Sequence, residues 1–200
     1  MEPVVFLTNW MMTAQSGFYY LKLRKHPDTS RSFKSWSYFF LLFAGSTFFG
    51  GLSHLLFHYL DLRGKIPGWS LAILSITFLE LGVFQQSNRS HWNKGVGLQT
   101  LVIFILLILD FKFLWVTIQT VIGLVLVLGI VSFQELKKGE RHWRGYLFGI
   151  GWMLLSVPVL MLQLDFSIWF NRHDISHLLM MLCLYQFYRT TLNMSTPTGN

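Results

Sequence analysis

Residues 93–133 read NKGVGLQTLVIFILLILDFKFLWVTIQTVIGLVLVLGIVSF. Two apolar runs, 93–109 and 113–133, are separated only by Asp110, Phe111 and Lys112. A membrane-spanning helix needs about 20 mostly apolar residues, so the second run is long enough and the first is short. The stretch predicts two spans joined by a tight turn at the membrane interface. A merged or re-entrant segment within 93–133, which would leave six spans, is the alternative.

The composition of the whole chain agrees with a membrane protein. Of its 200 residues 52% are hydrophobic and 12% are charged, with a mean hydropathy of +0.46. A soluble domain carries about 25% charged residues. The chain starts with Glu2 rather than a basic region and lacks a small-residue cleavage site, so its first apolar run is interpreted as a span and not as a signal peptide.

The sequence therefore predicts an all-α fold, a polytopic transmembrane bundle of seven helices. Residues 1–192 form one domain, and residues 193–200 form a flexible polar tail. The predicted spans are 3–21, 36–60, 67–86, 93–109, 113–133, 146–164 and 173–192.

The basic residues predict the orientation of this bundle. With seven spans, twelve fall on one side: Lys22, Arg24, Lys25, Arg31, Lys34, Arg89, Lys94, Lys137, Lys138, Arg141, Arg144 and Arg189. Four fall on the other: Arg63, Lys65, Lys112 and Arg172. The positive-inside rule then places the N-terminus outside and the C-terminus in the cytoplasm. The net charge of +7 belongs to these flanks and does not indicate nucleic-acid binding. The compact loops favour a bacterial inner (cell) membrane.

Four histidines occur where charged or polar groups are costly. His54 and His58 end the second predicted span, and His173 and His177 open the seventh. Each pair is spaced i, i+4 and shares one helix face. Both pairs fall near the outer side, at one membrane depth. Imidazoles at one depth on facing helices can bind zinc, and three protein ligands leave a fourth position for water.

The second span carries glycines on the same face as its histidines. Thr47, Gly50, Gly51, His54 and His58 share one broad face of the helix. The glycines can either open a small cavity beside a metal or let another helix approach closely.

Simpler interpretations stay open for several of these residues. His58 can be an interfacial residue, and His173 can belong to the loop before the last span. Asn171 can cap that helix, with Asp174 three positions later completing a capping box. The histidines can also join spans by hydrogen bonds, or bind haem. Glu80, deep in the third span, can be bonded to Ser75, Gln119 or a neighbouring backbone group.

Two segments contain three of the four histidines: Gly50-Gly51-Leu52-Ser53-His54 and Phe170-Asn171-Arg172-His173-Asp174-Ile175-Ser176-His177. In these two segments and in its seven predicted spans, the chain resembles the CREST superfamily. This group includes alkaline ceramidases, progestin and adipoQ receptors, and remodelling hydrolases of GPI-anchored lipids. The resemblance implies a zinc ion held by His54, His173 and His177. Gly50 stands where the family has a serine, so Ser53 and Asp174 are the candidate catalytic residues.

The predicted function is that of a zinc-dependent intramembrane hydrolase that cleaves an amide or ester bond of a membrane lipid. A zinc-bound water would attack the carbonyl carbon. The alternative is a non-catalytic membrane receptor, sensor or scaffold with structural histidines. A third possibility is electron transfer through a haem held by two histidines.

Overall fold

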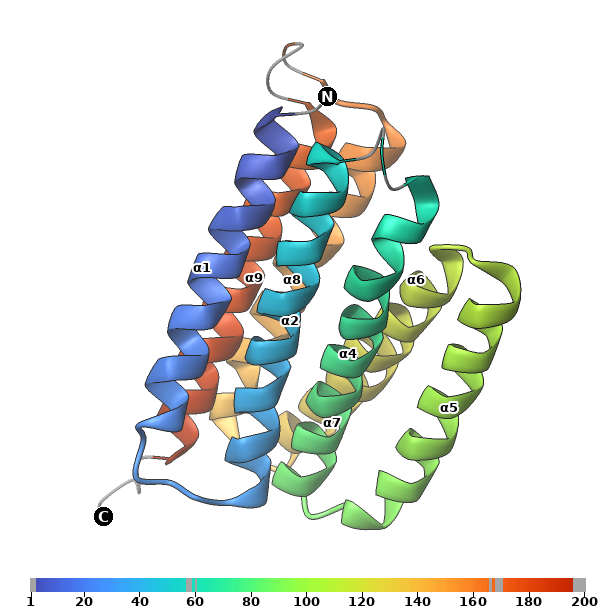
Figure 1. Cartoon of the computed structure of the whole chain (residues 1–200). Coiled ribbons are helices and arrows are strands. Elements are labelled where there is room, and N and C mark those ends of the chain that lie inside the picture. The colour runs from blue at the N-terminus through green and yellow to red at the C-terminus, as the bar shows by residue number, and fades with distance from the viewer. Residues whose placement is uncertain (1–2, 57–58, 60, 166, 168–170, 196–200) are drawn as a thin grey trace.

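The computed structural model describes residues 3–56, 59, 61–165, 167 and 171–195. The regular structure of these residues is entirely helical, without a strand. Seven long helical segments lie side by side in a bundle (Figure 1). They are α1 (Pro3–Arg24), α2 (Arg31–Leu55), α4 (Ile66–Gln86), α5 (Asn93–Asp110), the continuous segment 114–137, α8 (Arg144–Met161) and α9 (Arg172–Ser195). Short helical turns precede three of them: η1 (Asp61–Lys65), η2 (Ser90–Trp92) and η4 (Arg141–Trp143).

The seven predicted apolar runs are confirmed as helices, with shifts at their ends. α2 begins at Arg31 because Ser30 caps it: the Ser30 hydroxyl accepts the Phe33 N–H at 3.2 Å. α2 ends at Leu55, and His58 lies outside the described residues. α9 continues to Ser195, which shortens the predicted polar tail.

Five of these helices are long and apolar enough to cross a membrane: 31–55, 62–86, 90–110, 114–137 and 141–161. α1 and α9 carry more polar residues and do not meet that measure within the described part of the chain. Much of this polarity faces the interior, because Thr8, Asn9, Thr190 and Thr191 are buried. The architecture is that of a multi-pass membrane protein.

The tight turn predicted at Asp110, Phe111 and Lys112 is confirmed. Phe111 ends α5 in the left-handed conformation with φ of 47°, and the Lys112 ammonium contacts the Asp110 carboxylate at 2.8 Å. The chain then re-enters the bundle as α6 (Leu114–Thr120) beside α5. The merged alternative for 93–133 is wrong, because two separate helices flank this turn.

The segment 114–137 changes its helical form along its length. α6 passes into the π-helical η3 (Val121–Gly129), which continues as α7 (Ile130–Lys137). Gly123 faces α4 here: a Cβ added to it would lie 3.1 Å from Glu80 Oε1. The glycine thus permits close packing of η3 against α4.

The main core joins α1, α2, α4, η3, α7, α8 and α9 through large aromatic side chains. Trp36 stacks on Tyr146 with ring centroids 4.8 Å apart, and Phe187 packs against both rings. α5 lies outside this core and packs on α4 and α6 through Ile73, Ile103, Leu107 and Val116. The exposed face of α5 is apolar, as expected for a helix in contact with lipid.

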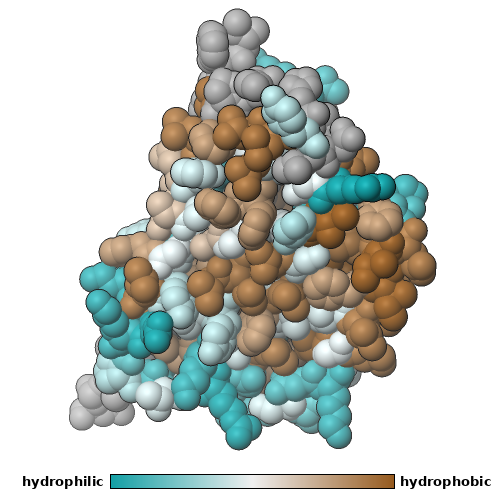
Figure 2. Space-filling model, viewed as in Figure 1, coloured by the Kyte–Doolittle hydropathy of each residue, from teal (hydrophilic) through white to brown (hydrophobic). Residues whose placement is uncertain are grey.

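The two ends of the bundle differ in their residues. The N-terminus, the α5–α6 turn and the end of α8 lie at one end (Figure 1). The α1–α2, α4–α5 and α7–α8 connections lie with the C-terminal end of α9 at the other end. Hydrophilic residues gather at this second end, below an apolar band, on the face shown in Figure 2. We call the first the histidine end and the second the basic end.

Candidate functional site

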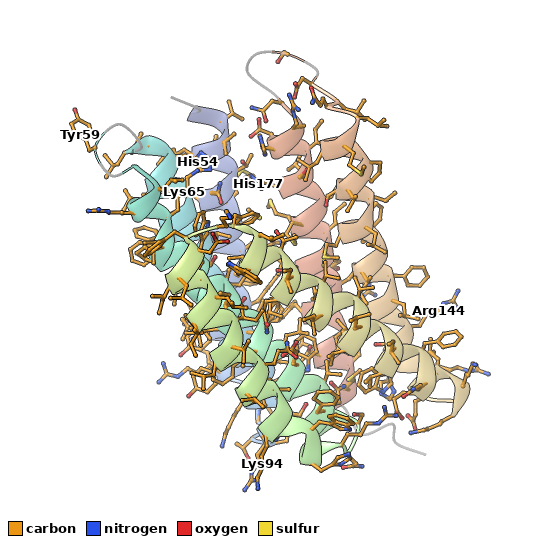
Figure 3. All side chains as sticks on the ribbon, turned by 90° about the vertical axis from the view of Figure 1, so that its right-hand side faces the viewer. His54, Tyr59, Lys65, Lys94, Arg144 and His177 are labelled. Atoms are coloured by element: carbon orange, nitrogen blue, oxygen red, sulfur yellow. The ribbon has the colours of Figure 1, made fainter. Side chains whose placement is uncertain are left out.

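His54 and His177 lie at the histidine end, on α2 and α9, as the sequence predicts (Figure 3). Both side chains are partly buried, and they are close enough for the charge of one to affect the other. His173 lies one turn before His177 and is exposed. The charge of His173 also affects His177, so the bundle brings all three predicted ligands into one electrostatic environment.

The His177 ring contacts Thr8 of α1, and Thr8 in turn contacts Asp174 of α9. Its Nδ1 lies 2.7 Å from the Thr8 hydroxyl oxygen on α1. The same hydroxyl donates to the Asp174 carboxylate, with Oγ1 3.2 Å from Oδ1. Asp174 is fully buried and Thr8 is 5% exposed. The three side chains form a buried hydrogen-bonded chain between α1 and α9, which we call the Thr8 relay.

The Thr8 hydroxyl has four possible acceptors, the Val4 and Val5 carbonyls, Asp174 Oδ1 and His177 Nδ1, so the tautomer of the His177 ring depends on which of them takes its proton. A hydroxyl has one proton, and the carboxylate can only accept it. When Thr8 donates to Asp174, His177 must donate its Nδ1 proton to the Thr8 oxygen. Nε2 then carries a lone pair and can accept a proton or bind a metal.

Asp174 has a second role at the start of α9. Its Oδ2 accepts the Asn171 N–H at 3.0 Å, while Asn171 Oδ1 accepts the His173 N–H at 2.8 Å. These reciprocal bonds confirm the capping arrangement that the sequence suggests for this helix. One carboxylate thus caps α9 and orients a side chain one turn later.

Asp165 and Arg172, on either side of the segment before α9, form an ion pair. Asp165 Oδ1 accepts from the Arg172 backbone N–H at 2.8 Å and from its Nε at 3.2 Å. Asp165 Oδ2 accepts from Arg172 Nη2 at 2.8 Å. These hydrogen bonds from Arg172 hold the pKa of the Asp165 carboxyl below its ordinary range.

Ser53 and the neighbouring glycines serve helix packing in this structure. The Ser53 hydroxyl donates to the Gly50 carbonyl at 2.7 Å within α2. A Cβ on Gly51 would lie 2.7 Å from Trp10 Cδ1, and one on Gly50 would lie 3.3 Å from Asn9 Oδ1. The close-approach interpretation of the glycines is therefore correct, and the interpretation as a cavity below a ligand is wrong, because α1 fills that space.

Ser53 also borders a void on the other side of α2. A cavity of about 320 Å³ lies between α2 and the η1–α4 segment, lined in part by Phe49, Ser53, Arg63 and Pro67. Neither His54 nor His177 lines it. Ser53 thus borders a cavity between α2 and α4, whereas the Thr8 relay lies between α1 and α9.

The fit of these residues to a zinc ion is partial. When Thr8 donates to Asp174, His177 resembles a metal ligand, because such histidines usually donate their second nitrogen to an oriented acceptor. The described residues nevertheless contain no group of three His, Cys, Asp or Glu side chains gathered as ligands. A zinc site requires His54 and His173 to turn toward Nε2 of His177.

Thr8 is the functional-site residue that sequence reasoning missed. It is an isolated hydroxyl in an apolar stretch near the start of the first helix, beside Asn9. Its position could have indicated this role, because Thr8 and His177 each lie five residues after the start of their helices, at the same end of the bundle. Its partner on α9 depends on which helices are neighbours in the bundle.

These features define the class: a multi-pass helical membrane protein in which a partly buried histidine joins a buried threonine and a buried aspartate at one end. The chain belongs to a family of unknown function, DUF6962, which it matches over residues 4–196. No curated protein and no solved structure matches the chain.

Proposed function

We propose that the histidine end is a zinc-dependent site that hydrolyses an amide or ester bond of a membrane lipid. The ligands are His54, His173 and His177. The Thr8 relay is the observation that carries this proposal, because Nε2 of His177 is the acceptor nitrogen when Thr8 donates to Asp174.

The geometry suggests how each side chain contributes. His177 is oriented by Thr8, and Thr8 is oriented by the buried Asp174 carboxylate. Asp174 therefore acts as a positioning residue. When bound, zinc would activate a water molecule and polarise the lipid carbonyl. Ser53 remains a candidate to contact the substrate through the cavity that it lines between α2 and α4.

The apolar surface around this end suits a lipid substrate. Trp10 and Phe48 stack with ring centroids 5.5 Å apart, and both are exposed, as are Phe49 and Leu55. Exposed aromatic and aliphatic side chains at a helix end are compatible with lateral entry of a lipid from the bilayer. In this proposal all seven helices cross the membrane, with the histidine end outside and the basic end in the cytoplasm.

The test is the zinc content of the detergent-purified protein by elemental analysis. We expect about one zinc per chain, as in a single catalytic site, with loss of the metal in His54→Ala and in His177→Ala. His91→Ala is the matched control, because His91 is exposed at the basic end. Wild type without zinc after reconstitution, or equal loss in all three variants, would contradict the proposal.

A second candidate function is supported by the same contacts. The Thr8 relay joins α1 to α9, and such a link stabilises helix association in a receptor, sensor or scaffold without any metal. His177→Gln separates the two functions. A structural histidine tolerates an amide that keeps a bond to Thr8, whereas a zinc ligand does not.

A further inference from the structure

A second cavity lies at the basic end, between α1 and α2. Its volume is about 310 Å³, and it is unrelated to the histidine end. Arg24 and Tyr20 line it from α1, and Lys34 and Tyr38 line it from α2. Leu23 and Phe33, which are 1% and 5% exposed, form its apolar wall. We call it the Arg24–Lys34 cavity.

The lining residues are arranged in two layers along the bundle axis. Tyr20 precedes Arg24 by four residues, and α1 runs toward the basic end. Tyr38 follows Lys34 by four residues, and α2 runs away from that end. Each tyrosine therefore lies about one helical turn, or about 6 Å, deeper than the cation on its own helix. Two cations form the outer layer and two phenols the inner layer.

One acidic residue, Asp28, also lines the cavity, and it forms hydrogen bonds within the α1–α2 loop. Asp28 Oδ1 accepts the Ser30 N–H at 2.8 Å, and the Asp28 N–H donates to His26 Nδ1 at 3.2 Å. The His26 ring lies against Phe33, with ring centroids 4.8 Å apart. These contacts shape the α1–α2 loop, which borders the cavity at the basic end. Arg24 and Lys34 outnumber this single carboxylate.

We propose that the Arg24–Lys34 cavity binds the phosphate headgroup of an anionic membrane lipid. Arg24 and Lys34 would contact the phosphate oxygens, because guanidinium and ammonium groups are the usual protein partners of phosphate. The tyrosine hydroxyls, one turn deeper, would lie at the level of the ester groups of the lipid. Amphipathic aromatic rings favour this interfacial depth.

The surface beyond the cavity can accept the acyl chains. Tyr38 is 47% exposed, and Leu41, one turn further along α2, is 38% exposed. Both therefore face outward, and in this proposal they lie where the hydrocarbon layer begins. A free phosphate ion can make the same contacts as the headgroup, but it has no acyl chains to contact this apolar surface.

The experiment measures binding to the purified full chain in a neutral detergent, by native mass spectrometry and by the thermal unfolding midpoint. The probes are short-chain phosphatidylglycerol, phosphatidylcholine and inorganic phosphate. The test variant is Arg24→Gln with Lys34→Gln. The matched control is Lys94→Gln with Arg144→Gln, which removes the same charges at the same end outside the cavity (Figure 3).

We expect phosphatidylglycerol to bind the wild type best. The test variant should bind it about 25-fold more weakly, since each of the two basic residues near an anionic membrane contributes about fivefold. The control should lose much less. Arg24→Lys keeps the charge and should retain most of the affinity, which separates binding from misfolding.

Two outcomes would overturn the proposal. Equal weakening in the test and control variants would mean that only the general positive field of the basic end attracts anionic lipid. Inorganic phosphate that binds as tightly as phosphatidylglycerol, with the same dependence on Arg24 and Lys34, would mean a free-anion site and no lipid site.

Discussion

Two polar clusters of this bundle each contain a buried carboxyl group, and they differ in how that group is hydrogen-bonded. The Thr8 relay contains Asp174, and a second cluster contains Glu80 on α4; both carboxyl groups are fully buried. Glu80 Oε1 accepts from Gln99 of α5 at 3.0 Å, and Glu80 Oε2 accepts from Gln119 of α6 at 3.4 Å. Gln99 also donates to Gln119 Oε1 at 3.1 Å, which closes the cluster.

The two clusters differ in whether a nitrogen atom is left over that could bind a ligand. In the Glu80 cluster the three side chains bond to one another. The neighbouring stretches 95–109 and 113–134 contain no Asp, Glu, Lys, Arg or His, so amides alone stabilise this carboxyl group there. In the Thr8 relay the last member is a ring with a second nitrogen. A closed cluster is suited to holding helices together, whereas an open one keeps a group for a ligand.

The largest expected effect concerns the closed cluster. Glu80→Ala leaves the amides of Gln99 and Gln119 without their acceptor, which should lower the free energy of unfolding by about 4 kcal/mol. Glu80→Gln keeps an acceptor oxygen and should cost about 1 kcal/mol. Denaturant unfolding in detergent measures both. Equal losses in the two variants would show that the hydrogen bonds to Glu80 contribute little.

The next effect concerns the carboxylate of the open cluster. Asp174→Ala removes the cap of α9 and the acceptor of the Thr8 hydroxyl, and should lower the free energy of unfolding by about 2 kcal/mol. In a double-mutant cycle, Thr8→Val and Asp174→Asn should be non-additive by about 1 kcal/mol. Additive effects would mean that the two side chains do not act together.

A smaller effect on folding, and a distinct one on metal, is expected for Thr8→Val. The change keeps the side-chain shape but frees the His177 ring. Under the zinc proposal it should lower zinc affinity about 10–100-fold, as for other partners of metal-binding histidines. Competition with a coloured chelator measures this affinity. Thr13→Val is the matched control, because Thr13 bonds to Thr47 instead. The same loss in both variants would argue against the relay.

The smallest effect is expected at the exposed Asp165–Arg172 pair. The pKa of Asp165 is lowered in the folded protein, so this carboxylate stabilises the fold above its unfolded pKa of about 3.9. That contribution is lost as the pH falls through the lower folded pKa. Asp165→Asn should therefore differ from wild type in its unfolding midpoint near neutral pH and converge with it in acid. A difference that does not change with pH would exclude this cause.

The histidine end shows how far the sequence allowed prediction. The i, i+4 spacing and the span order placed His54 and His177 at one end, and the Asn171 and Asp174 spacing predicted the cap of α9; both are confirmed. His58 lies outside the described residues. The zinc site, the catalytic roles of Ser53 and Asp174, and the CREST resemblance stay predictions.

The sequence by itself determined the helices, their number and the tight turn at Phe111, since these depend on runs of apolar residues and on local capping. Only the tertiary structure decided that Thr8 meets His177, that Gln99 joins Gln119 at Glu80, and that Trp10 of α1 lies against Gly51. These contacts depend on the rotation of each helix about its axis and on which helices are neighbours. Helices that are apolar on most sides encode neither locally, because packing between whole faces sets both.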